Sequence, residues 1–249
     1  MASIGTVDLP DRIDRERYFR ELSYLELSLL FAGPVKPGVI AKWKAAIPEG
    51  SSVGLVAPWV LTDRAPPKAP QVWTHDATVA EFRDSAPARE ALAKFREVLT
   101  ELSAAFAIFR SPALFAPSAA NRETLKKFFG ELATAELLGV PRVWVPDGLW
   151  DLRTAVAFAA ELGVICAFDP LVRDPGQPPE VHYDLDLAAL YLRVTGLGRS
   201  GPIRSERLDD LVMLVEHYAD VEGGIAIAFE SPSRWQDARN FKKTVESEL

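Results

Sequence analysis

The chain has 249 residues, of which 48% are hydrophobic and 25% are charged, and its formal net charge is −7. Its 15 Gly and 19 Pro are too few for a low-complexity or disordered chain, and the acidic balance argues against a nucleic-acid-binding surface. The single cysteine, Cys166, excludes an internal disulfide and a Cys-x-x-Cys metal site. We expect a soluble, cytoplasmic protein without a membrane partner, because no apolar run approaches the ~20 residues that cross a bilayer and no signal peptide opens the chain.

Strand-like and helical patterns alternate along the chain from its amino end. Short apolar runs predict strands at residues 4–9, 24–31, 53–57, 104–109, 142–145, 165–168, 190–194 and 225–229. Between them, apolar residues recur at spacings of three and four, which predicts about seven helices. Eight strands alternating with helices in this length favour an α/β fold, a single compact (β/α)8 TIM-type barrel over residues 1–249. An open, doubly wound sheet is the alternative.

A weak internal repeat supports the barrel. Gly139 and Gly163 each follow a Glu-Leu segment and directly precede a predicted strand. Glycine at the end of a helix adopts the left-handed conformation that closes it. The two glycines are 24 residues apart (163 − 139), which is close to the length of one strand–helix unit in a compact barrel.

Side-chain alternation places several polar residues inside the barrel. In the second strand Tyr24 and Glu26 point to the barrel axis, and in the seventh Tyr191 and Arg193 do so. A charged group inside a barrel is costly unless it is paired. We therefore expect Glu26 and Arg193 to contact each other or a shared ligand, either as a functional pair or as an ion pair that braces the barrel.

Active sites of such barrels lie where the strands end at their carboxyl side. Charged residues fall there repeatedly, and we take as catalytic candidates Glu26, Asp169, Arg193 and Glu230. The ligand-binding candidates are Asp8, Arg110, Asp147, Gly196, Gly198 and Arg199. The glycine-rich loop over 196–201 is a candidate phosphate site, because barrels often bind phosphate after strands seven and eight. Asp169, which precedes a proline, has a turn-capping role as its alternative, and Glu230 has an ion pair with Arg110 or Arg193 as its alternative.

The sequence predicts no metal ligands and does not identify a cofactor, with a hard cation held by carboxylates as the alternative. The three histidines, His75, His182 and His217, lack the spacing of a zinc site, and we expect them in surface positions or behind the site. Cys166 falls in a strand and is expected to be a core residue, not a nucleophile.

Short motifs in order along the chain resemble the YecE-like family, whose members are uncharacterised TIM-barrel proteins grouped as a domain of unknown function. They are Ile4-Gly5-Thr6, Leu25-Glu26-Leu27-Ser28, Val39-Ile40-Ala41-Lys42-Trp43, Asp169 and Tyr191-Leu192-Arg193-Val194-Thr195-Gly196. The resemblance implies a TIM barrel with a pocket and no established reaction. The chain departs from the family pattern at the ends of its strands, with Ala57-Pro58-Trp59, Thr195 and Glu230-Ser231 where the family has Lys, His and paired Asn.

Three functions follow from these residues. The first is an enzyme-like barrel that binds a small anionic ligand, phosphate- or sugar-like, and acts as a hydrolase or isomerase. The second is a non-catalytic barrel that binds a ligand or a protein partner, which the lost family positions favour. The third is carboxylate- and metal-dependent processing of nucleic acid, against which the net charge argues.

Overall fold

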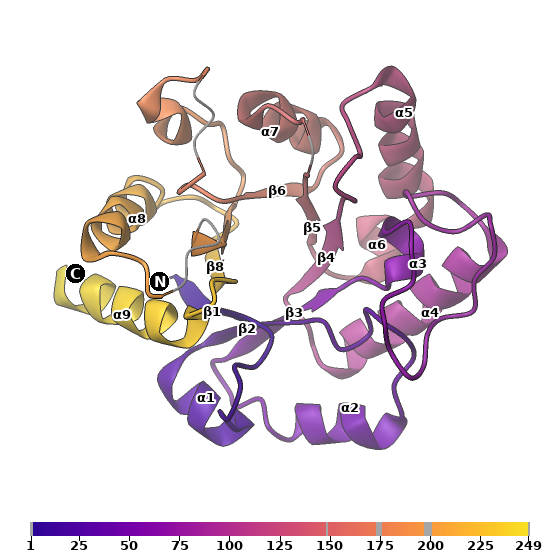
Figure 1. The fold of residues 1–249 in the computed structure, drawn as a ribbon, viewed down its shortest axis with the longest axis horizontal. Coiled ribbons are helices and arrows are strands. Elements are labelled where there is room, and N and C mark those ends of the chain that lie inside the picture. Colours follow the sequence, from indigo (N-terminus) through magenta and orange to yellow (C-terminus); the bar gives the residue numbers. More distant parts are fainter. Residues whose placement is uncertain (1, 148, 173–175, 197–200, 249) are drawn as a thin grey trace. The chain divides into compact units, whose positions relative to one another are not determined.

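The computed structural model describes residues 2–147, 149–172, 176–196 and 201–248. Eight parallel strands follow one another in chain order and close into a barrel (Figure 1), which confirms the predicted fold. The strands are β1 (Ser3–Val7), β2 (Tyr24–Leu27), β3 (Ser52–Val56), β4 (Phe106–Arg110), β5 (Arg142–Val145), β6 (Ile165–Phe168), β7 (Leu190–Val194) and β8 (Ile225–Phe229). No helix in these residues is long and apolar enough to cross a membrane.

Helices connect most of the strands. They are α1 (Arg15–Glu21), α2 (Pro37–Lys44), α3 (Trp59–Thr62), α4 (Ala86–Glu101), α5 (Ala119–Lys127), the π-helix η1 (Phe128–Leu132), α6 (Ala135–Leu138), α7 (Leu152–Glu161), the 3-10 helix η2 (Pro179–Tyr183), α8 (Ser205–His217) and α9 (Arg234–Glu248). Side-chain caps fix several starts: Asp14 accepts from the amide of Arg17 at α1, and Ser85 accepts from that of Ala88 at α4. The left-handed Gly139 ends α6, as its place before a strand predicted.

The structure differs from the predicted elements in three places. The second strand ends at Leu27, before the predicted 31, because the chain turns there and the Phe31 amide donates to the Ser28 carbonyl. The fourth strand begins at Phe106 because Ala104 still donates to a carbonyl of α4. The apolar stripe after α5 continues as a π-helix, in which Ala133 donates to Phe128.

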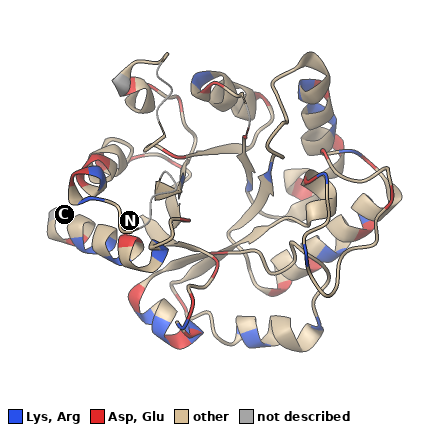
Figure 2. Cartoon of the chain, in the orientation of Figure 1, with Lys and Arg blue, Asp and Glu red and all other residues tan. Residues whose placement is uncertain are grey.

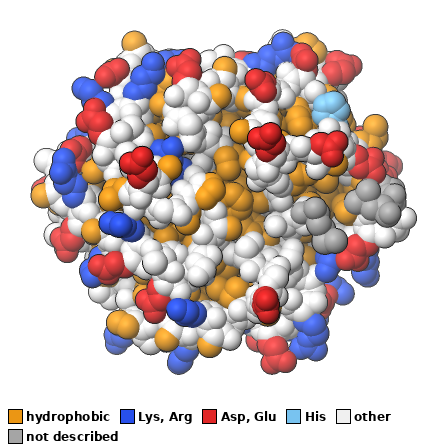
Figure 3. Space-filling model, turned by 180° about the vertical axis from the view of Figure 1, so that it is seen from behind, with side chains coloured by type: hydrophobic (Ala, Val, Ile, Leu, Met, Phe, Trp, Pro, Cys, Tyr) orange, Lys and Arg blue, Asp and Glu red, His pale blue; other side chains and the backbone are white. Residues whose placement is uncertain are grey.

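The chain divides into two compact units, which we describe one at a time. Unit 1 comprises Met1–Glu26, Ile47–Ser52 and Ala167–Leu249, and unit 2 comprises Leu27–Ala46 and Val53–Cys166. Most charged residues lie on helices and loops (Figure 2), and acidic and basic side chains are interspersed on the face drawn in Figure 3.

In unit 1, β1 and β2 lie unusually close together at Gly5. Gly5 is in register with Tyr24, and a Cβ placed on Gly5 would be 1.6 Å from the Tyr24 carbonyl oxygen. The Tyr18 hydroxyl bridges the two strands beside Gly5, because it donates to the Tyr24 carbonyl at 2.7 Å and accepts from the Thr6 amide at 2.8 Å. The Ile4-Gly5-Thr6 motif is therefore a packing requirement of the two strands.

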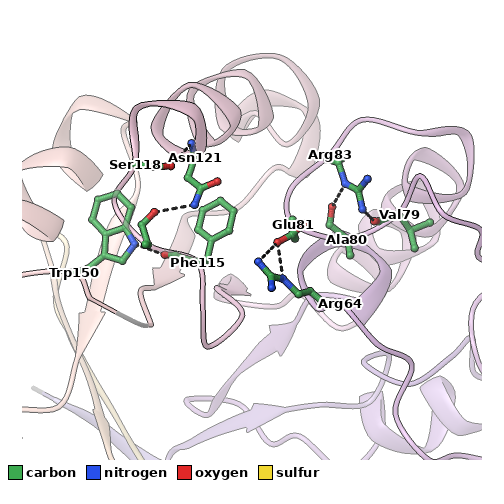
Figure 4. Close-up of polar contacts among 10 residues, drawn as sticks. Arg64, Val79, Ala80, Glu81, Arg83, Phe115, Ser118, Asn121 and Trp150 are labelled. Atoms are coloured by element: carbon green, nitrogen blue, oxygen red, sulfur yellow. Dashed lines mark hydrogen bonds and ion pairs between the residues drawn. The ribbon is translucent and has the colours of Figure 1, made fainter.

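In unit 2, an irregular turn caps the short helix α3. Three consecutive non-glycine residues, Ala80, Glu81 and Phe82, have positive φ angles of 76°, 53° and 61°. Their amides donate to the carbonyls of α3, which offsets the backbone strain of this conformation. Arg83 folds the preceding loop by donating to the carbonyls of Ala80 and Val79 (Figure 4). The turn thereby fixes the chain that follows β3.

Candidate functional site

The centre of the candidate site is a buried ion pair inside unit 1. Arg193 of β7 donates from Nε to Glu26 Oε1 of β2 at 3.1 Å. The side chain of Glu26 is 0% exposed and that of Arg193 is 7% exposed. The contact that side-chain alternation predicted is thus confirmed, and both side chains point inward because they occupy positions of the same parity on their strands.

The same guanidinium also holds Glu230, which follows β8. Nη1 of Arg193 lies 3.2 Å from Glu230 Oε2, and Nη2 donates to Oε1 at 3.3 Å, so the contact is a two-pronged fork. Burial alone would lower the pKa of Arg193, but the charges of Glu26 and Glu230 raise it above its ordinary value. The side chain of Glu230 is 34% exposed. Glu230 is therefore the member of the group that a dissolved molecule can reach.

Two tyrosines extend the group into the barrel interior. The Tyr191 hydroxyl donates to Glu26 Oε2 at 2.8 Å, and the Tyr24 hydroxyl oxygen lies 2.7 Å from that of Tyr191. Alternation had placed both rings inward, but nothing in the sequence indicated that they join Glu26 in one hydrogen-bonded chain. Side chains from β2 and β7 thus form a single buried polar network.

Asp169, which follows β6, has its carboxylate occupied by the backbone and by Thr195. Oδ2 accepts from the Thr195 amide at 2.8 Å and from its hydroxyl at 2.6 Å, while Oδ1 accepts from the Leu171 amide at 2.9 Å. These bonds are those of a capping residue that joins the ends of β6 and β7. The catalytic role of Asp169 remains a prediction, and its contacts favour the structural alternative.

The other predicted residues of unit 1 fall in different surroundings. Asp8 follows β1 with φ 53°, and its amide donates to the Glu26 carbonyl at 2.7 Å. Gly196 has φ 69°, and a Cβ there would lie 2.9 Å from Cβ of Ser231, so the glycine makes room for a neighbouring loop. Gly198 and Arg199 lie outside the described residues.

Unit 2 brings together a second set of charged residues at the ends of its strands. Arg110 ends β4 and its guanidinium lies 6.0 Å from the ring centre of Phe31, while Asp147 follows β5. Asp63, which the sequence analysis missed, lies near both: burial raises its pKa, Arg110 lowers it and Asp147 raises it further. Its place after the four-residue helix α3 explains the omission, because so short a helix leaves no periodic signal.

Several other polar residues serve the fold. His182 is buried at 6% exposure with its ring stacked on Phe168 at the end of β6, which excludes the surface alternative and leaves the expected position behind the site. Arg142 is buried and donates to carbonyls at the ends of η1 and α7. Cys166 is buried, as predicted. In the described part of the chain, no group of three or more His, Cys, Asp or Glu is arranged to hold a metal ion.

Unit 2 also carries a cleft of about 500 Å³ on the side of α5 and η1. Figure 4 shows Arg83, which lines the cleft, and two bonds of loops in the same unit, from Trp150 Nε1 to the Phe115 carbonyl and from Asn121 Nδ2 to the Ala116 carbonyl. None of the predicted site residues lines the cleft, whose walls are Ala77, Thr78, Phe82, Arg83, Asp84, Arg89, Thr124, Lys127, Phe128, Glu131 and Leu132.

Comparison with known proteins finds similar folds among solved structures. No protein-family model matches the sequence, and no curated protein matches it either. Among solved structures, the chain is similar to a DUF72 family protein from Enterococcus faecalis, with a TM-score of 0.72 and 14% identity over 99% of this chain and 96% of that one. A DUF72 family protein from Thermotoga maritima gives a TM-score of 0.67 with 14% identity, over 99% of each chain.

A sugar-converting enzyme has the same fold. An L-ribulose 3-epimerase matches with a TM-score of 0.63 and 14% identity, over 100% of this chain and 93% of that one. The YecE-like proteins are the DUF72 family. The chain therefore has the TIM-barrel fold that DUF72 family proteins share with xylose isomerase-like enzymes.

Proposed function

We propose that this chain is a diverged YecE-like barrel that binds a small sugar-like ligand beside Glu230 and acts on it as an isomerase. The observation that carries the proposal is the fork from the buried Arg193 to the part-exposed Glu230. A carboxylate held in a fixed orientation at the carboxyl end of a barrel strand can take and return a proton. The likeness to sugar-converting barrels supports this reaction type.

The charges around Arg193 favour a sugar-like over a phosphate-like ligand. Two carboxylates, Glu26 and Glu230, meet one guanidinium, so the group carries one net negative charge when all three are ionised. Such a group repels an anion, whereas it can accept hydrogen bonds from the hydroxyls of a neutral polyol. The exposed oxygen atoms of Glu230 are the acceptors that we assign to these hydroxyls.

The proposed step moves one proton between neighbouring carbon atoms. The Glu230 carboxylate removes the proton from the hydroxyl-bearing carbon beside a carbonyl. The electron pair of that C–H bond forms a carbon–carbon double bond while the π pair of the carbonyl moves to its oxygen, which gives an enediolate. Glu230 then returns the proton to the former carbonyl carbon, and the proton of the neighbouring hydroxyl passes to the charged oxygen, so that the carbonyl is now on the neighbouring carbon. No electrons are gained or lost overall, so an isomerisation of this kind needs no oxidant or reductant.

Proton exchange in D2O tests the proposal. The protein is incubated with a panel of neutral aldoses and ketoses, and ¹H NMR follows loss of the signal beside the carbonyl. We expect exchange with the wild type, at least a hundredfold less with Glu230→Gln, and wild-type exchange with the matched surface variant Glu206→Gln on α8. No exchange and no thermal stabilisation by any sugar would contradict the proposed function.

A non-catalytic binding barrel is the second candidate, and a specific observation favours it. Thr195, where the family has His, is tied to Asp169, and the Arg193 fork is already filled by carboxylates. Both features suit a site that holds a ligand without reacting. Thermal stabilisation by a sugar in the absence of exchange would identify this candidate.

A further inference from the structure

The tyrosine pair behind the ion pair has no role in the proposed proton transfer. Tyr24 is 0% and Tyr191 is 1% exposed, so neither hydroxyl reaches a dissolved ligand. Burial first, and then the negative charge of Glu26, raise the pKa of both hydroxyls well above the ordinary value for tyrosine. Both therefore keep their protons at neutral pH and act as hydrogen-bond donors.

The direction of the hydrogen bonds follows from the partners. The Tyr191 proton points to Glu26 Oε2, so the bond between the two hydroxyls takes its proton from Tyr24. Glu26 then accepts on both oxygens, from Tyr191 on one and from Arg193 Nε on the other. The hydrogen bonds thus connect Tyr24 to Tyr191 and Tyr191 to Glu26. Arg193 then links Glu26 to Glu230.

We propose that Tyr191, supported by Tyr24, is a positioning residue that keeps Glu26 ionised and so sets the charge that Glu230 experiences through Arg193. An ionised carboxylate at 0% exposure depends on the donors around it, because water does not reach it. Without the Tyr191 hydroxyl, Glu26 loses a donor and takes up a proton. The charge of Arg193 then acts on Glu230 alone and favours its ionised form.

Other titratable groups near the carboxyl ends of the unit 1 strands include Asp8 after β1, Asp169 after β6 and Asp237 of α9, whose carboxylate accepts from the hydroxyl of Ser231 beside Glu230. The carboxylate of Asp169 is held by Thr195 and Leu171. Its titration therefore serves as an internal reference for any shift at Glu230. The inference rests on the proposed function only in taking Glu230 as the acid–base group.

A carboxyl-carbon NMR titration of the full chain tests the inference without any substrate. Protein labelled with ¹³C at the Glu and Asp carboxyl carbons is titrated, and the Glu230 signal is identified by its absence from Glu230→Gln. We expect Tyr191→Phe to move the Glu230 titration to lower pH by about one unit, because water around the 34% exposed Glu230 screens the roughly three units that a charge about 4 Å away produces at an effective dielectric of ~20. Tyr24→Phe leaves both hydrogen-bond donors to Glu26 in place and should shift the Glu230 titration by less than Tyr191→Phe does.

Glu26→Gln removes directly the charge that Tyr191 is proposed to protect, so it covers the case in which Tyr191→Phe does not fold. It should shift the Glu230 titration downward by at least as much as Tyr191→Phe, and adding Tyr191→Phe to it should add nothing. An unchanged Glu230 titration in either folded variant would overturn the inference, even if the variant unfolds at a lower temperature. Because no ligand is present, that result is distinct from a failure of the proposed isomerase.

Discussion

Replacing Arg193 with methionine leaves the volume of the side chain nearly intact but removes the guanidinium that contacts two carboxylates. Glu26 remains fully buried, and removing one partner of a buried ion pair costs about 3–5 kcal/mol. Glu230 is 34% exposed and regains water, so its lost contact adds only about 0–1 kcal/mol. We expect Arg193→Met to lower the free energy of unfolding by about 4 kcal/mol, a large part of the roughly 5–15 kcal/mol of an ordinary domain.

Urea unfolding at pH 7, followed by circular dichroism, measures this loss. Arg207→Met on α8 is the matched control, because its ion pair with Asp210 is about half exposed and its removal should cost at most about 1 kcal/mol. The double variant Glu26→Gln/Arg193→Met should be more stable than Arg193→Met, since no charge is then buried without its partner. A double-variant cycle with a coupling energy below about 0.5 kcal/mol would refute this reasoning.

The pH dependence of the same variant has a defined sign. In Arg193→Met, the buried Glu26 binds a proton more tightly in the folded chain than in the unfolded one. Its protonated form therefore stabilises the fold at low pH, and this contribution is lost as the pH rises. The stability difference from the wild type should be smaller at pH 5 than at pH 7, and an equal difference at both values would contradict the expected protonation.

Three further outcomes follow from the packing. Gly5→Ala should destabilise the protein by about 3 kcal/mol or more in urea unfolding, because the new Cβ would lie 1.6 Å from the Tyr24 carbonyl oxygen. An unfolding midpoint equal to that of the wild type would contradict the close approach of β1 and β2 at this residue. Burial raises the pKa of Cys166 to about 12, so a thiol reagent at pH 8 should label it only in the unfolded protein, and rapid labelling of the native chain would show otherwise. Burial also raises the pKa of Asp237, so its protonated form contributes stability that is lost as the pH rises above about 4. Asp237→Asn should therefore reduce the change in the free energy of unfolding between pH 4 and pH 7. An unchanged pH dependence of that free energy would argue against the raised pKa.

The barrel and its central ion pair could be predicted because both follow from short-range regularities. Successive side chains of a strand point to opposite faces, and the apolar residues of β2 and β7 show which face packs on the helices. The inward direction of Glu26 and Arg193 follows from their positions between those residues. The choice of Arg193 over Arg110 as the partner of Glu230, and the tyrosine chain, could not be predicted in the same way. They depend on the register between strands that are far apart in sequence, such as Leu190 opposite Ile225.

The elements that the sequence analysis misplaced have their own physical reasons. The run from Leu27 to Phe31 is apolar except for Ser28, and apolarity alone does not separate a strand from a turn that packs on the core. A π-helix carries nearly the same apolar spacing as an α-helix, so η1 is hidden in the stripe that includes Phe128 and Phe129. Asp63 was missed because it follows the four-residue helix α3, which is too short to leave a periodic signal.

That turn has a consequence for how the chain can vary. The Ala80 amide returns to the Val60 carbonyl at 2.7 Å, next to where α3 ends at Thr62, so residues 63–79 leave the barrel and come back to the same place. Trp73, in the middle of this excursion, is 5% exposed, and its indole Nε1 donates to the Leu30 carbonyl at 2.7 Å, so the later part of the loop is packed against the segment that follows β2. The mostly exposed residues 64–70 are therefore the part of the loop whose length can change without moving a strand.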